Sequence, residues 1–160
     1  MPGYVEHRII HGEEFRRVVL ALKAQDKTIP RKIRRALRLK SNDAITKVRE
    51  RVLAIPVKGE ESTGLRRRVA RGVRLRLNRS LSSARIITMM DDPEEAALPR
   101  GLDTPSGWRH PVFGNRDNWV RQTTGGEWFR EEIAEQRPEF ARAFGEVLDE
   151  ARDMIDLAGH

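Results

Sequence analysis

The sequence predicts a protein of mixed helices and strands, because its apolar residues follow two different spacings. Segments near both ends place apolar residues three and four positions apart, which is the spacing of one helical face. Between them, Val73, Leu75 and Leu77 alternate with arginines, as expected of a strand with one buried face. A chain of 160 residues has room for one core, so we expect a single domain over residues 1–160.

The first third of the chain predicts a strand followed by helices. Residues 4–10 (YVEHRII) are aromatic and β-branched enough to pair in a sheet, and Gly12 ends this run. Residues 13–25 then carry one apolar stripe at helical spacing, and two glutamates at their start favour a helix N-terminus.

A second apolar face continues from Pro30 to Pro56, with residues 41–43 (SND) marking a kink or a break. Its members are Ile33, Leu37, Ala44, Val48, Val52 and Ile55. The other faces of this segment carry basic residues that we expect to meet solvent or a partner: Arg31, Lys32, Arg34, Arg35 and Arg38.

The middle of the chain predicts a hairpin and then a long loop. Ser62 or Thr63 could cap a short turn before the strand that begins at Val73. Residues 85–90 (RIITMM) are expected to pair with that strand as a hairpin. Residues 91–107 hold three prolines, two glycines and five acids, and this composition is typical of a long loop that is functional or orders on assembly.

The last third predicts an edge strand and a C-terminal helical region. Residues 108–113 suit a strand, and Pro111 favours an edge or a bulge. Residues 114–126 are rich in turn residues. Residues 127–157 are helical, and Pro138 is expected to divide them into two parts. The second part should bury a stripe: Ala141, Phe144, Leu148, Ala151 and Ile155.

Charge divides the chain into a basic part and an acidic part. The net formal charge is +7, but the first 90 residues carry 23 Lys and Arg against 8 acids, and the last 70 carry 8 against 16. Three interpretations stay open. The acidic C-terminal helix could lie on the basic helices of its own chain, one copy could meet the next in a ring, or the basic part could bind nucleic acid.

Several classes of chemistry are excluded or lack their motif. Without cysteine there is no disulfide, thiolate metal site or cysteine nucleophile. There is no Walker loop, G-x-G-x-x-G, H-E-x-x-H or G-x-S-x-G motif, and His7 and His11 lack a third ligand nearby. No apolar run is long enough to span a bilayer and no secretory signal is visible, so we expect a protein kept inside a cell or in a particle assembled there.

The most informative segment is residues 107–130, GWRHPVFGNRDNWVRQTTGGEWFR. It contains all three tryptophans and five of the nine aromatic residues of the chain. Aromatic and arginine side chains are enriched in protein interfaces, but the same aromatics could instead close one end of the core. Stacking on nucleic-acid bases is a third interpretation, with few interleaved basic residues to support it.

The string WRHPVFGN, followed by W-V-x-Q and then W-F, resembles the signature of neck or tail-completion proteins of long-tailed, siphovirus-type bacteriophages. The resemblance implies an α+β fold, with long N- and C-terminal helices packed on a small, mostly antiparallel sheet. It also implies a structural protein without catalytic residues, cofactor or metal. Such a protein forms a ring, most often a hexamer, between the head connector and the tail tube, and double-stranded DNA passes through its lumen. The protein is expected to be located in the virion, after assembly in the host cytoplasm. No membrane is expected among its partners.

The motif maps onto the residues that we expect to contact other subunits or partners: Trp108, Arg109, His110, Pro111, Phe113, Asn115, Trp119, Trp128 and Phe129, together with Gly114 and Gln122. Two rival functions remain. A basic nucleic-acid-binding protein would use arginines on the strand face: Arg71, Arg74, Arg76 and Arg79. A metal-dependent nuclease would use His110 with Asn115 and Asn118, although no further histidine follows before His160.

Overall fold

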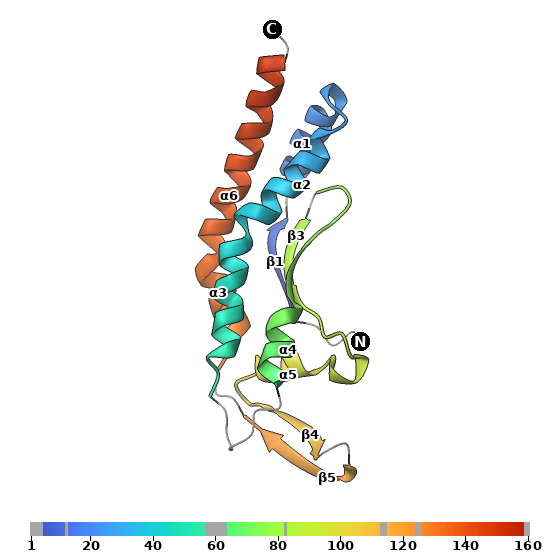
Figure 1. The fold of residues 1–160 in the computed structure, drawn as a ribbon, viewed down its shortest axis with the longest axis vertical. Coiled ribbons are helices and arrows are strands. Elements are labelled where there is room, and N and C mark those ends of the chain that lie inside the picture. The colour runs from blue at the N-terminus through green and yellow to red at the C-terminus, as the bar shows by residue number, and fades with distance from the viewer. Residues whose placement is uncertain are drawn as a thin grey trace.

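In a computed structural model of the chain, helices and strands form an α+β structure, as the sequence predicts, and the molecule is elongated (Figure 1). The structure describes residues 5–11, 13–56, 64–81, 83–112, 115–123 and 126–158. The helices in this part of the chain are α1 (Glu13–Gln25), α2 (Ile29–Lys40), α3 (Asn42–Leu53), α4 (Leu65–Gly72), the 3-10 helix η1 (Pro93–Glu95), α5 (Leu98–Leu102) and α6 (Trp128–Ala158). The strands are β1 (Val5–His11), β2 (Val73–Leu77), β3 (Ser83–Thr88), β4 (Trp108–Val112) and β5 (Asn115–Gln122).

The first three strands form an antiparallel sheet in the order β1-β3-β2. The predicted hairpin of β2 and β3 is confirmed, with Leu75 opposite Ile86. Its connecting turn is not a tight two-residue type, because Asn78 Oδ1 accepts the backbone N–H of Ser83 across a longer loop. Leu81 in this loop has a φ of 57°, which is unusual for leucine, and its side chain is buried in the core. Burial of the Leu81 side chain therefore stabilises this turn conformation.

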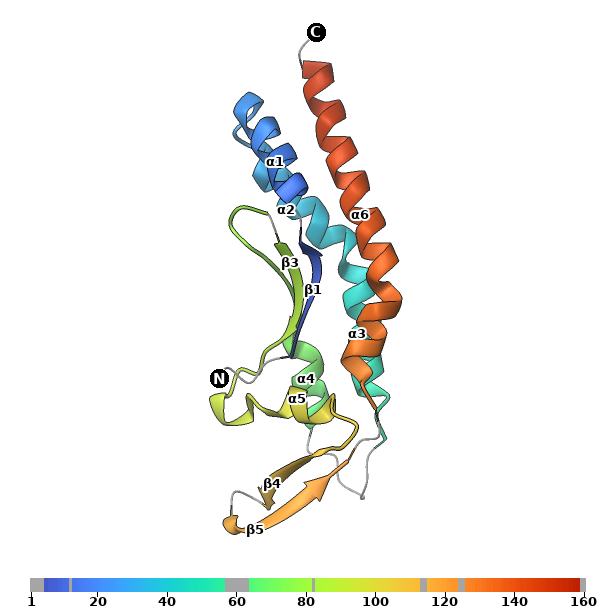
Figure 2. The same cartoon turned by 180° about the vertical axis from the view of Figure 1, so that it is seen from behind.

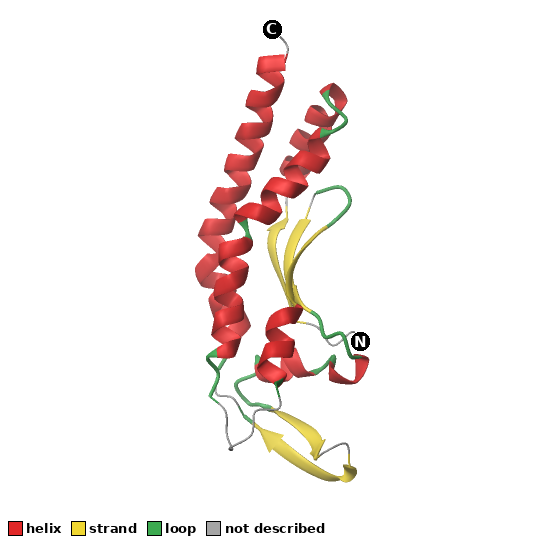
Figure 3. Cartoon of the chain, viewed as in Figure 1, coloured by secondary structure: helices red, strands yellow, loops and turns green. Residues whose placement is uncertain are grey.

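Helices α2, α3 and α6 lie along one side of this sheet (Figure 3). The apolar face predicted from Pro30 to Pro56 is buried, and it is divided between two helices, because α2 ends at Lys40 and α3 begins at Asn42. Ser41 between them is fully buried and donates its backbone N–H to Leu37 O. Both helices pack against α6 along the long axis of the molecule (Figure 2).

Two clusters of buried side chains form the core, and the half-buried Leu75 touches both. The first cluster joins α3, α4, α5, the sheet and the start of α6: Ala44, Ile45, Val48, Val52, Val69, Ala70, Val73, Ile86, Leu102, Trp128, Phe129, Ile133 and Phe140. The second joins α1, α2 and the later part of α6: Val19, Leu22, Ile29, Ile33, Leu37, Leu81, Ala84, Phe144, Val147 and Ala151.

The prediction that Pro138 divides the C-terminal helix is wrong, because α6 runs uninterrupted past it. The Pro138 side chain is exposed, while Ile133 before it and Phe140 after it are both buried in the first cluster. Packing on both sides of the proline outweighs the backbone hydrogen bond that it removes. The predicted stripe is also corrected, since Ala141 is exposed and the neighbouring Phe140 takes the buried position.

Two further predictions are corrected. Residues 91–107 are not one long loop, because they include η1 and α5, and α5 buries Pro99, Gly101 and Leu102. Residues 114–126, predicted as turns, contain the eight-residue strand β5. The expected caps Ser62 and Thr63 lie outside the described residues.

The acidic helix α6 forms ion pairs with the basic helices of its own chain. Lys40 Nζ lies 2.7 Å from Glu146 Oε2 and 3.1 Å from Glu150 Oε1, and Arg51 pairs with Glu131. The hydrogen bond with Glu146 raises the pKa of Lys40, and the same bond lowers the pKa of Glu146. Part of the charge asymmetry is therefore compensated within the chain.

Candidate functional site

Strands β4 and β5 form a separate antiparallel hairpin at one end of the molecule, opposite the C-terminal end of α6 (Figures 1 and 2). Trp108 pairs with Gln122 at its base, and Pro111 pairs with Trp119 farther along, followed by an irregularity between Pro111 and Val112. Each of the eight residues of β5 is exposed. The hairpin therefore presents a surface that the rest of its chain does not cover.

The base of the hairpin is held tightly against α5. The ring of Trp108 packs so closely on Gly101 that a Cβ there would lie 2.5 Å from Trp108 Cδ2. Gly107 has a φ of 71°, and a Cβ on it would lie 2.0 Å from Gln122 O. Arg121 Nε also donates to Ser106 O at 3.1 Å. These close contacts fix the direction in which the hairpin leaves the body.

Trp119 is the largest exposed apolar side chain of the hairpin. It is 46% exposed, and its Nε1 donates to Arg116 O at 2.5 Å, which holds the indole ring in place. The next residue, Val120, is 40% exposed. Because successive strand residues point to opposite faces, both faces of the hairpin carry apolar surface. A fixed, exposed tryptophan of this kind is suited to a protein–protein contact.

The free end of the hairpin carries polar groups with local partners. Asn115 Oδ1 accepts the backbone N–H of Asp117 at 2.9 Å, in a turn that asparagine favours. Arg109 is exposed and Pro111 is half-buried. Phe113, Gly114 and the side chain of His110 lie outside the described part of the structure.

The other two aromatic residues of the predicted contact set belong to the core. Trp128 and Phe129 begin α6 and are 4% and 0% exposed, with their rings edge to face at 5.4 Å. The aromatic segment therefore has two roles: its C-terminal end closes the core, and Trp119 lies at the surface. The sequence alone leaves these two interpretations open.

Asp103 connects α5 to the beginning of α6, a role that the sequence analysis missed. Its Oδ1 accepts the backbone N–H of Phe129 at 2.7 Å and of Arg130 at 3.4 Å, so it caps α6 from 26 residues away. Burial raises the pKa of Asp103, against the opposite effect of these backbone hydrogen bonds. Capping signals in a sequence are local, so nothing near Trp128 indicates this partner.

The arginines predicted to share a strand face do not form one ladder. Arg74 and Arg76 lie exposed on β2, but Arg71 belongs to α4 and Arg79 to the turn after β2. Arg74 lies 3.7 Å from Asp91, and Arg76 contacts the sulfur of Met89.

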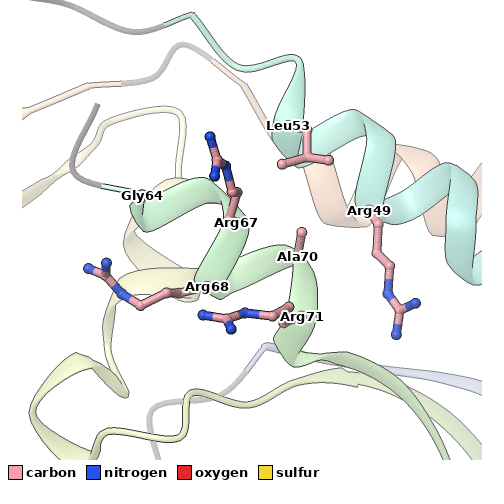
Figure 4. A pocket seen from close by; sticks show the side chains of 7 residues that line it. All are labelled: Arg49, Leu53, Gly64, Arg67, Arg68, Ala70 and Arg71. Atoms are coloured by element: carbon pink, nitrogen blue, oxygen red, sulfur yellow. The ribbon is translucent and has the colours of Figure 1, made fainter. Parts of the chain in front are cut away.

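A second feature missed from the sequence is a pocket of about 620 Å³ between α3 and α4 (Figure 4). Helix α3 supplies Arg49 and Leu53, and α4 supplies three more arginines. The residues that line the pocket are Arg49, Leu53, Gly64, Arg67, Arg68, Ala70 and Arg71, and we call it the arginine pocket. The repeated arginines of the string GLRRRVAR were the available signal, but only the fold brings Arg49 next to them.

Among the described residues, no three or more histidine, aspartate or glutamate side chains gather where they could hold a metal ion. Over the same ranges, no helix is both long enough and apolar enough to cross a membrane. In comparisons with protein-family models, with curated proteins and with solved structures, this chain has no match.

Proposed function

We propose that this protein is a structural subunit of a virion, which forms a ring at the head–tail junction, completes the tail and joins it to the head connector. The observation that carries the proposal is the β4–β5 hairpin, because an isolated two-stranded hairpin is at best marginally stable in water. All of β5 is exposed, and it carries the fixed indole of Trp119. Such a hairpin is suited to being covered by another protein when a particle assembles.

The same segment carries the resemblance to neck and tail-completion proteins. Its expected partners are other copies in a ring, expected to be hexameric, the other neck and connector proteins, and the tail-tube protein. Double-stranded DNA would pass through the lumen without sequence-specific binding. Exposed arginines such as Arg31, Arg35 and Arg38 on α2 suit a surface near a phosphate backbone. The role requires no catalytic residue, cofactor or metal, and it places the protein in the virion after assembly in the host cytoplasm.

The test is the variant Trp119→Ala, in particles assembled with this chain supplied from a separate gene. We expect heads and tails to remain unjoined, because the substitution removes the largest exposed apolar side chain of the hairpin. The free energy of unfolding of the purified chain should change by only about 0.5 kcal/mol, since the side chain is half-exposed.

The matched control is Leu39→Ala, which removes another exposed apolar side chain, on α2 and far from the hairpin. This variant should assemble joined particles at the normal yield. Normal joining with Trp119→Ala, or electron micrographs of intact particles without this chain at the junction, would contradict the proposed function.

A further inference from the structure

The arginine pocket has more positive charge than the described residues around it compensate. Arg68 forms two hydrogen bonds with Glu95, at 2.7 and 3.0 Å, and Arg49 donates to Val73 O at 2.9 Å. The side chains of Arg67 and Arg71 are exposed, and within the described ranges neither makes a hydrogen bond or an ion pair. A pocket lined by four arginines, with one glutamate paired to them in the described part of the chain, attracts an anionic group.

The pocket also offers apolar surface. Leu53 lines it and is 48% exposed, and Ala70 lies beside it (Figure 4). A nucleic-acid backbone has phosphates but no aliphatic side chain to cover an exposed leucine. An acidic peptide segment with an apolar side chain matches both properties, so the pocket favours a protein ligand.

The chain contains such a segment at the end of α6, in residues 149–156, which we call the acidic tip. Asp149, Asp153 and Asp156 are exposed and lie four and three residues apart, so they share one helical face. Asp153 and Asp156 make no ion pair with any described residue. Met154 beside them is 46% exposed. The acidic tip thus matches the arginine pocket in charge and in apolar surface.

The two surfaces cannot meet within one molecule. The acidic tip lies at the C-terminal end of α6, beside α1 and α2, whereas α4 lies near the hairpin, in the opposite half of the long axis (Figures 1 and 2). A contact between them must therefore join two copies through different surfaces. Contacts of this head-to-tail kind generate a ring when the rotation closes.

We propose that the arginine pocket of one copy receives the acidic tip of a second copy. This contact would join neighbouring subunits of the ring, and in that respect the proposal rests on the proposed function. The contact itself can be measured on the purified chain without heads or tails, so its failure is distinguishable from failure of the proposed role at the junction.

The experiment reverses charge on each side and measures self-association by analytical ultracentrifugation at low salt. Arg67→Glu with Arg71→Glu should weaken self-association at least about tenfold, and Asp153→Arg with Asp156→Arg should weaken it similarly. The chain carrying all four changes should regain association, as should an equal mixture of the two reversed chains. The matched control, Arg17→Glu with Arg137→Glu, makes the same charge change at exposed side chains of α1 and α6 and should associate normally.

A wild-type chain that stays monomeric at low salt, or a fourfold variant that fails to regain association, would overturn the proposal. A third outcome would also overturn it. If the change at Arg67 and Arg71 leaves self-association intact but abolishes salt-dependent binding of duplex DNA, the pocket binds nucleic acid instead.

Discussion

The two antiparallel sheets of this protein differ in what covers them. The β1-β3-β2 sheet lies against α3 and α6 and contributes the fully buried Val73 and Ile86 to the core. The β4–β5 hairpin packs on α5 at its base, through Trp108, and its second strand is exposed throughout. The first sheet is stabilised by its own chain, whereas the second sheet leaves apolar side chains exposed.

Two aromatic residues ten positions apart show this difference most clearly. Phe129 is fully buried at the start of α6, and Trp119 is half-exposed on β5. Both belong to the same aromatic segment, so residue type alone does not separate core from surface. The difference lies in the element to which each residue belongs. Phe129 lies on α6 within the core, and Trp119 lies on the exposed strand β5.

The largest expected effect is on the core. Phe129→Ala should lower the free energy of unfolding by about 3–5 kcal/mol, because it leaves a cavity in the first core cluster. Chemical denaturation measures this, with Trp119→Ala as the comparison. Similar losses in the two variants would mean that Trp119 is also part of the core, and would remove the contrast between the two regions.

A smaller effect is expected at the base of the hairpin. Gly107→Ala would place a Cβ about 2 Å from the backbone oxygen of Gln122, at a φ that favours glycine. We expect the amide hydrogens of β4 and β5 to exchange about tenfold faster or more, which corresponds to about 1.4 kcal/mol of local stability.

The matched control for this change is Gly145→Ala in α6, where a Cβ would meet nothing within 4 Å. This substitution should leave hairpin exchange unchanged and stabilise the helix slightly. Unchanged exchange in the Gly107 variant would show that the hairpin is not held at this point.

An effect of similar size is expected at the link between α5 and α6. Asp103→Ala should destabilise the chain by about 1–3 kcal/mol, because the buried N–H of Phe129 loses its acceptor. Asp103→Asn keeps an acceptor and should cost less.

The pH dependence of stability tests the effect of the Asp103 charge separately from its hydrogen bonds to the start of α6. Burial raises the pKa of Asp103 above its ordinary value of 3.8, so the folded chain binds a proton there more readily than the unfolded chain. Relative to Asp103→Asn, the wild-type chain should gain stability as the pH falls through this raised pKa, and the gain should stop below 3.8. Denaturation curves at several pH values measure the difference, and a gain in the opposite direction would contradict burial as the dominant cause.

The elements with strong periodicity were predictable from sequence. The alternation of Val73, Leu75 and Leu77 with arginines identified β2, and the apolar face through Leu37 and Val48 identified α2 and α3. These signals work because each element must bury one face, and the spacing of that face depends on local backbone geometry alone. The unusual segment containing Trp119 was also recognisable, although its division between core and surface was not.

Tertiary structure decided the rest. Strand β5 is polar and lies among turn residues, and it is a strand because β4 pairs with it. Helix α6 passes Pro138 because the core holds both sides of it, and Asp103 caps that helix from another element. The arginine pocket requires α3 to lie beside α4. The sequence by itself determined the elements whose signal is local and the charge of each part of the chain. Contacts between distant residues decided which weak elements form and which aromatic side chains stay exposed, because their energy exists only once the chain has folded.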